Sequence, residues 1–422
     1  MKGNRYWLLA LGYWLLGVQL SGQTIADELR ADAQRAAGLS YSLPITELPA
    51  DTPPAGKKLF YINHYGCPSA YYVERSENDD DPFRTLARAD SLGKLTPLGS
   101  DVLRRVAQLR YEARDKRGEL TEVGKRQSRE FARHIMQRYP ELIAENVYFD
   151  GRSVVENHCI LTLGESSLQL IQMHPSRLGN VDASNRSSSW MNARDEELEN
   201  RRTDSLSMRR YSEFATRWPT DDKRLMAQLF SDADYAACVD AAALSRQLFG
   251  LKIYDVFTPE DIHRHWMHRN AWAYIRYGGY LLNGGHQPYV QRKPLSNLIH
   301  QGDSIMKLDY PVIHLRYTHE RVVVSLACLL ELDGYGVQTS CLDSLETYGW
   351  ADYRIAPLGG SIIFQHYRTD KNDPDPLVRV LLNGRVSKLP IPTDCAPYYH
   401  WGDVKRYYLR KLYLYAKKRN DE

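Results

Sequence analysis

The stretch LFYINHYGCPSAYY, residues 59–72, decides the fold of this chain. Its first part, Leu59 to Gly66, is rich in aromatic and β-branched side chains, which favours a buried strand. The strand ends at a His-Tyr-Gly corner, and strand ends are where α/β enzymes commonly place their reactive side chains. The residues that follow, 67–71, carry no charged side chain. The segment predicts an α/β protein whose loop after the first strand lacks reactive groups.

Residues 64–71 resemble the first motif of the histidine phosphatase superfamily, in its acid phosphatase and inositol polyphosphate phosphatase branch. In the inositol phosphatases this run reads roughly His-Tyr-Gly-Arg-His-Gly-Ser-Arg. Here the first three residues match, but Pro68 stands at the nucleophilic histidine. Cys67 and Tyr71 stand where the family has arginines. The resemblance implies a phosphatase fold without its nucleophile.

Five further segments resemble family motifs in the family's order. They are GELTEVGKRQ (118–127), GRSVVENHC (151–159), LRYTHE (315–320), VRVLLNG (378–384) with the Leu-Pro pair at 389–390, and PYYHW (397–401). Thr121 predicts an N-cap for a helix that runs to about Tyr139. In the 151–159 segment Arg152 matches the family, whereas the later arginine is replaced by His158.

The segment 315–320 corresponds to the part of the family that carries a second histidine and the proton donor. The resemblance therefore assigns His319 to the phosphate and Glu320 to protonation of the leaving group. In another subtype the acid falls one residue later, where this chain has Arg321. A purely structural role for Glu320, as a helix cap or pocket wall, also stays open.

The matched motifs predict a residual anion pocket made of Arg152, His158 and His319, with His64 as a further ligand-side residue. Phosphoryl transfer depends on electrostatic stabilisation, so losing the arginines is as serious as losing the nucleophile. A displaced nucleophile, His64 or His158, is the alternative. For His64, a corner histidine with only a structural role is the competing interpretation. Cys67 does not fit the cysteine phosphatase loop, which needs an arginine six residues later where this chain has Val73.

The pattern of elements predicts an α/β fold with a mixed central sheet flanked by helices and an inserted, mostly α-helical second domain. We expect an α/β domain from residues 23–158 and 305–422 and a helical insertion over 159–304. Strands are predicted at Ser361–Tyr367 and Leu377–Leu382, antiparallel to one another. The acidic run over 77–82 is predicted to be a solvated loop.

Residues 1–22 have the features of an export signal. Lys2 and Arg5 precede an apolar run from Trp7 to Leu20 that is too short to span a bilayer. We expect cleavage of the signal, no stable membrane anchor, and a periplasmic or extracellular protein. Removing the two basic residues lowers the formal charge from +3 to +1, which argues against nucleic-acid binding by bulk electrostatics.

The chain has six cysteines, an even number that permits disulfides in an exported protein. Cys328 and Cys341 are the most plausible pair, and buried free thiols are the alternative. No Cys-x-x-Cys or His-Glu-x-x-His spacing is present, so neither a metal site nor a cofactor is predicted.

The sequence thus predicts an exported pseudophosphatase of inositol polyphosphate phosphatase type, which binds a small phosphorylated or sugar-like ligand in the cleft between its domains. Catalysis is left uncertain and is not favoured. An active phytase-like phosphomonoesterase with a displaced nucleophile is one alternative. A non-catalytic interaction module for a glycan or a protein is the other.

Overall fold

The computed structural model describes residues 24–45, 47–50, 52–75, 77–144, 146–174 and 178–421. The expected signal peptide, residues 1–22, lies outside the described residues. Within them, no helix is both long and apolar enough to cross a membrane.

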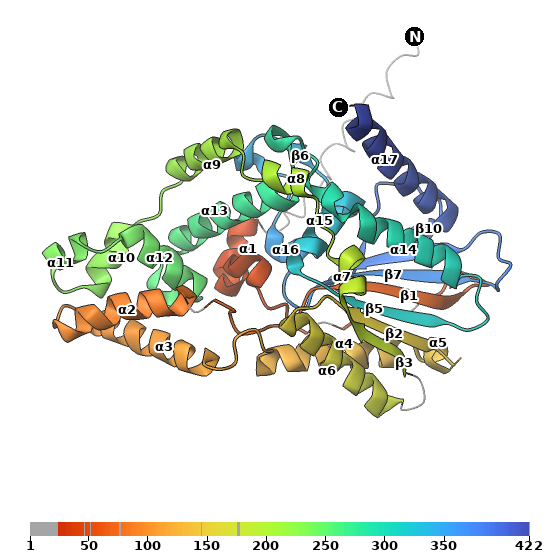
Figure 1. Cartoon of the computed structure of the whole chain (residues 1–422), viewed down its shortest axis with the longest axis horizontal. Coiled ribbons are helices and arrows are strands. Elements are labelled where there is room, and N and C mark those ends of the chain that lie inside the picture. Colours follow the sequence, from red (N-terminus) through yellow and green to blue (C-terminus); the bar gives the residue numbers. More distant parts are fainter. Residues whose placement is uncertain are drawn as a thin grey trace, which may run out of the picture.

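A mixed β-sheet forms the centre of the molecule (Figure 1). Its strand order is β10-β8-β7-β1-β5-β2-β3, and β9 pairs with β8. The strands are β1 (Lys58–Gly66), β2 (Tyr148–Ser153), β3 (Leu178–Ala183), β5 (Val312–Tyr317), β7 (Ser361–Arg368), β8 (Leu377–Leu382), β9 (Arg385–Ser387) and β10 (Tyr399–His400). Strands β1, β5, β2 and β3 are parallel, whereas β7 to β10 add antiparallel pairs. The predicted α/β class with a mixed sheet is confirmed, as is the antiparallel pair β7–β8.

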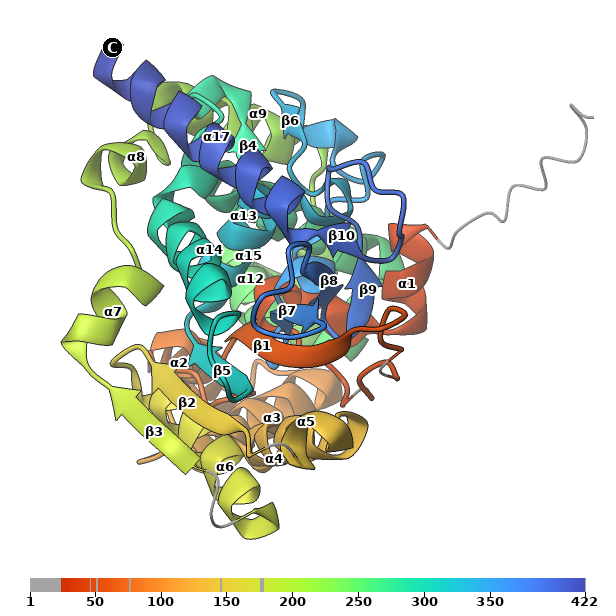
Figure 2. The same cartoon turned by 90° about the vertical axis from the view of Figure 1, so that its right-hand side faces the viewer.

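Helices cover both faces of this sheet, which explains why β5 and β7 are buried along their whole length. Figure 2 shows α4 (Glu122–Arg138), α5 (Pro140–Ala144) and α6 (Asn157–Met173) on one side. The other side carries α14 (Arg292–Ile305), α15 (Glu320–Leu330) and α17 (Trp401–Asp421). Helix α15 is buried from Val322 to Leu330, which makes it the central helix of this layer. Thr121 caps α4 as predicted, because its hydroxyl accepts from the Gly124 amide at 3.1 Å.

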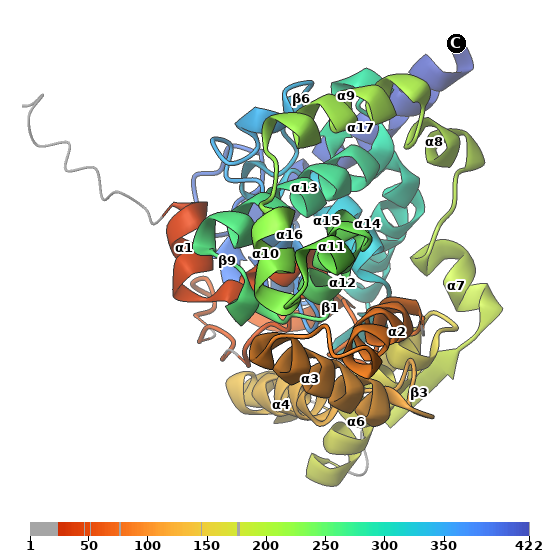
Figure 3. The same ribbon diagram turned by 90° about the vertical axis from the view of Figure 1, so that its left-hand side faces the viewer.

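A helical region lies beside the sheet domain and faces the viewer in Figure 3. Here α2 (Glu77–Ser91) and α3 (Pro97–Ala113) pack with α10 (Asp222–Leu229) and α12 (Ala241–Gly250). The other short elements are α1 (Ile25–Ala31), α7 (Asn185–Met191), α8 (Glu196–Arg201), α9 (Ser205–Arg217), α11 (Ala233–Ala237), α16 (Asp352–Ile355), and the strands β4 (Gly279–Tyr280) and β6 (Gln338–Thr339). The long helix α13 (Pro259–Tyr277) contacts α12, α15 and α9.

The chain moves between the two regions more often than a single insertion implies. Helix α6 and strand β3 belong to the sheet layers although they lie within 159–304. Helices α2 and α3 pack with the helical region although they lie within 23–158.

The acidic run over 77–82 was predicted to be a loop and that prediction was wrong, because these residues begin α2. Acidic side chains are favourable in the first turn of a helix, where the macrodipole is positive. Asp79 is also buried and pairs with Arg117 at 2.9 Å, which fixes this turn to the end of α3.

All six cysteines are free thiols. The predicted pairing of Cys328 with Cys341 is therefore wrong. Cys328 lies inside the core on α15, whereas Cys341 is exposed at the start of a short 3₁₀ turn. Their closeness in sequence did not indicate that one side chain is buried and the other is exposed.

Candidate functional site

His64 lies near the end of β1, where its side chain packs into the core. Its ring centroid is 4.7 Å from that of Phe131 on α4 and 5.1 Å from that of Tyr317 on β5. Burial, with a further contribution from the positive charge of Arg316, lowers the pKa of His64 to about 3. Gly66 is needed at this corner because a Cβ there would lie 2.5 Å from Cε1 of the His64 ring. The imidazole is neutral, 1% exposed and enclosed, which favours its structural role.

The loop after β1 uses its backbone donors inside the protein. The amides of Cys67, Ser69 and Ala70 donate to the Gly360 carbonyl at 2.8 Å, the Thr162 hydroxyl at 3.1 Å and the Gln127 side-chain oxygen at 2.9 Å, respectively. Pro68 has no N–H to offer, and its carbonyl accepts from Gly359 at 2.8 Å. An anion-binding loop presents such N–H groups to its ligand. In this loop the N–H groups of Cys67, Ser69 and Ala70 are already hydrogen-bonded to acceptors within the protein.

Beyond this loop, the first turn of α6 meets the first turn of α15. His158 on α6 and His319 at the N-cap of α15 have ring centroids 5.5 Å apart. Tyr71 stacks on the His158 ring at 4.2 Å with an angle of 12° between the planes. The Tyr71 hydroxyl also donates to Oε1 of Glu320 at 3.4 Å. Tyr71, which stands where the family has an arginine, therefore lies between His158 and Glu320.

The two histidines at this site are neutral. Burial lowers the pKa of His158, against the opposing effect of the carboxylates of Glu74 and Glu156. Burial also lowers the pKa of His319 to about 3, with further contributions from Arg321, His158 and Arg194. The pKa of Glu320 rises to about 7 because this carboxyl is buried. At neutral pH the site therefore offers two neutral imidazoles beside a carboxyl whose pKa lies near neutrality.

Arg152 belongs to a different cluster. Its Nε lies 3.1 Å from Oδ2 of Asp150, and Arg316 binds the same oxygen at 2.5 Å. Although burial alone would raise it, these interactions lower the pKa of Asp150 to about 2, with Arg316 as the largest stabilising influence. Both guanidinium groups are paired with the carboxylate of Asp150, which balances one of their two positive charges. The predicted pocket of Arg152, His158 and His319 is therefore brought together only in its histidine half.

Four arginines, of which the sequence analysis named only Arg321, lie near His319 or near one another. They are Arg194, Arg202 (at the C-cap of α8), Arg276 (on α13) and Arg321 (on α15). We call this group the arginine cluster. Burial is the main reason why the pKa of His319 is lowered, and the nearby charges of Arg321 and Arg194 add to this effect. Burial also lowers the pKa of Arg202, with smaller contributions from Arg276 and Arg321. Among the described residues, none of the four forms an ion pair with a carboxylate. No sequence signal marks this group, because its members come from four separate segments.

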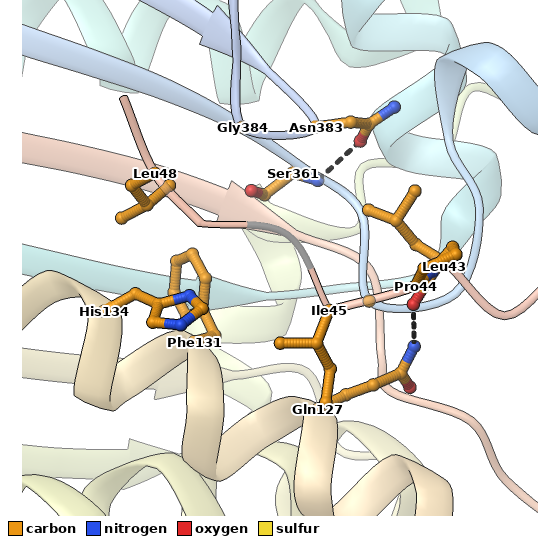
Figure 4. A pocket seen from close by; sticks show the side chains of 11 residues that line it. Leu43, Pro44, Ile45, Leu48, Gln127, Phe131, His134, Ser361, Asn383 and Gly384 are labelled. Carbon is orange, nitrogen blue, oxygen red and sulfur yellow. Dashed lines mark hydrogen bonds between the residues drawn. The ribbon is translucent and has the colours of Figure 1, made fainter. Parts of the chain in front are cut away.

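A pocket of about 40 Å³ lies on the far side of the His64 region (Figure 4). It is lined by Leu43, Pro44, Ile45 and Leu48, by Gln127, Phe131 and His134 of α4, and by the Gly359–Ser361 and Asn383–Gly384 turns. This volume holds about one water molecule, so the pocket does not suit an inositol polyphosphate.

The basic residues along α3 are mostly paired. Arg110 pairs with Asp80 and Arg117 with Asp79. Arg105 contacts both Asp101 and Asp255, at 2.9 and 2.7 Å. This helix therefore presents a solvated face and not a concentrated positive patch.

A mixed sheet covered on both faces, with a helical region beside it and paired histidines beyond the parallel strand ends, defines an α/β protein of the histidine phosphatase type. The family model described as histidine phosphatase superfamily (branch 2) matches residues 169–383. The chain belongs to this superfamily.

Solved structures with the same architecture include the multiple inositol polyphosphate phosphatase of Bifidobacterium longum in complex with inositol hexasulfate. It is 13% identical, with 88% of this chain and 97% of that chain covered and a TM-score of 0.71. The phytase from D. castellii is 11% identical, with 90% of this chain and 85% of that chain covered and a TM-score of 0.66. At these identities the likeness shows the fold. No curated protein matches the chain.

Proposed function

We propose that the protein is a catalytically impaired phosphatase, exported from the cell, that binds a phosphorylated or sugar-like ligand beside His319. The observation that carries this proposal is the loop after β1. Pro68 occupies the nucleophile's position, and the loop amides are bonded to protein acceptors. Tyr71 closes the remaining space by stacking on His158.

Ligand binding is supported by the arginine cluster. Several unpaired guanidinium groups near one another favour an anion, because each provides charge and directional N–H donors. Arg194 and Arg321 lie near His319, and Arg202 and Arg276 lie near Arg321, so we place the ligand towards these side chains. Of the family arginines in the two matched motifs only Arg152 is kept, and it is paired with Asp150, so such a ligand is held without being cleaved.

An active phosphomonoesterase is the second candidate. Glu320 favours it, since a carboxyl with a pKa of about 7 is suited to protonate a leaving group. The two candidates for a displaced nucleophile, His64 and His158, argue against an active phosphomonoesterase, because each is only 1% exposed. A phosphorus atom would have to come within roughly 3–3.5 Å of the attacking nitrogen.

Phosphate release separates these two candidates. The purified protein is assayed with phytate and with an aryl phosphate from acid to neutral pH, beside His319→Ala. We expect no release above the His319→Ala level. Turnover that disappears in His319→Ala would refute the impaired-enzyme proposal.

Ligand binding is tested by thermal shift with inositol hexasulfate and with myo-inositol. We expect the hexasulfate to raise the Tm of the wild type and to act less on Arg321→Ala. Arg104→Ala is the matched control, because Arg104 is an exposed arginine paired with Asp101 on α3. A shift with myo-inositol alone would identify a sugar-like ligand, and no shift with either would favour an interaction module. Fractionation of cells that express the full chain tests export.

A further inference from the structure

Three soft or borderline metal-ligand side chains meet where α6 and α15 begin. One donor atom from each of His158, Cys159 and His319 lies within 4.8 Å of the other two. In a tetrahedral zinc site, with bonds of about 2.0–2.3 Å, donor atoms lie roughly 3.3–3.6 Å apart. Shifts of about 1 Å would therefore close these three side chains around an ion.

A second observation points to a ligand at the same place. The Nε2 atoms of His158 and His319 are buried but form no hydrogen bond with any described residue. Buried polar atoms are nearly always satisfied, and an unrecorded ion is one recognised explanation for exceptions. Cys159 is 0% exposed, and its Sγ lies within 4.8 Å of one ring nitrogen of each histidine.

We propose that His158, Cys159 and His319 form a zinc-binding site. Imidazole and thiolate ligands select zinc over magnesium or calcium, which require oxygen ligands. Binding converts the Cys159 thiol to a thiolate and releases its proton to solvent. The inference concerns metal binding alone and does not depend on the proposed loss of phosphatase activity.

Two carboxylates are placed to complete the coordination. Oε1 of Glu156 lies 3.6 Å from Nε2 of His319, and Oε1 of Glu74 lies 3.0 Å from Nδ1 of His158. Their side chains are 45% and 52% exposed, so either one can swing in or leave the fourth position to water. Their negative charges, with that of the thiolate, also offset Arg194 and Arg321 on the other side of His319.

Replacement of the family arginine by His158 is what creates this donor set. A guanidinium is always protonated and cannot coordinate a metal, whereas a neutral imidazole can. The sequence analysis predicted no metal site because the spacing of the three ligands matches no zinc motif. Only the packing of α6 beside α15 brings His319 to the adjacent pair.

The test is a metal titration of the purified full chain after treatment with a chelator. Isothermal titration with Zn²⁺ is expected to give saturable binding of one ion at this site. Co²⁺, a spectroscopic probe for zinc sites, is expected to give a thiolate-to-cobalt charge-transfer band. Cys159→Ser should remove that band and weaken Zn²⁺ binding at least about tenfold.

Cys395→Ser is the matched control, because Cys395 belongs to an exposed group with Asp394 and His400 that has similar ligands. It should keep both the cobalt band and the affinity. Thermal unfolding without metal shows whether each variant folds, and His319→Gln, at a partly exposed position, gives a second test of the same site. The proposal is overturned if the wild type does not bind saturably, if Cys159→Ser and His319→Gln bind as the wild type does, or if only Cys395→Ser loses the band.

Discussion

Pro68 and Tyr71 together explain why the site cannot be restored by one substitution. Pro68 removes the attacking group, and Tyr71 occupies the space where the family has an arginine. Because the lost groups act on the same phosphate, each is useful only when the others are present.

Pro68→His therefore tests how much depends on the nucleophile alone. We expect no measurable phosphate release, since the missing arginines each cost about two to three orders of magnitude in rate. The measurement is phosphate release from an aryl phosphate, with Pro68→Ala as the control for the backbone change. Turnover by Pro68→His well above that of Pro68→Ala would show that the loop still forms an anion pocket.

Each buried neutral histidine makes the free energy of unfolding depend on pH. Burial lowers the pKa of His366, on β7, to about 3, with a small opposing effect from Asp303. Below pH 6.5 the unfolded chain takes up a proton that the folded protein does not bind. Stability is therefore lost as the pH falls from about 6.5 towards 3, by about 1.4 kcal/mol per pH unit for each such histidine.

His366→Leu should make the loss of unfolding free energy between pH 6.5 and 5 less steep, as measured by urea denaturation. His400 is the control, because hydrogen bonds to Asp394 and Asp375 raise its pKa and give the opposite dependence. His400→Gln should not flatten the acid-side loss. An unchanged slope in His366→Leu would mean that the imidazole is charged in the folded protein.

At the scale of elements, the start of α4 is fixed closely to the loop after β1. A Cβ at Gly124 would overlap the carbonyl oxygen of Ala70, so only glycine allows this approach. By contrast, a Cβ at Gly164, within α6, would meet no atom within 4 Å.

Gly124→Ala should therefore lower the free energy of unfolding by about 1–3 kcal/mol through overpacking. Gly164→Ala, the same change within another helix, should raise it by about 0.5–1 kcal/mol. Urea denaturation measures both. Equal effects of the two substitutions would show that α4 does not lie against the loop as described.

The position of the candidate site also follows from an arrangement of elements. Strands β2 and β5 are parallel neighbours, so their carboxyl ends lie at the same edge of the sheet. The helices that follow them, α6 and α15, start there and bring His158 close to His319.

The number of free thiols in the whole molecule tests whether any two cysteines form a disulfide. We expect six reactive thiols per chain when the purified protein is denatured without reductant and titrated with a thiol reagent. A reduced sample is the control for complete reaction. Four or fewer thiols in the untreated sample would show a disulfide and would contradict the buried, unpaired state of Cys328.

The sequence by itself determined the mixed α/β class, the order of the motifs and the presence of Pro68 where the resemblance expects a histidine. These features depend on local patterns, such as the apolar run that becomes β1 and the residues at the positions of Pro68 and Tyr71. The resemblance to the family also assigned Arg152, His158 and His319 to one pocket, and the structure brings the two histidine rings to 5.5 Å from one another.

Tertiary structure alone decided the charges at that site. Asp150 pairs with both Arg152 and Arg316, burial keeps His158 and His319 neutral at neutral pH, and the arginine cluster is gathered from separate segments. Burial and charge pairing depend on which side chains meet across long stretches of chain, and no local spacing in the sequence records those contacts.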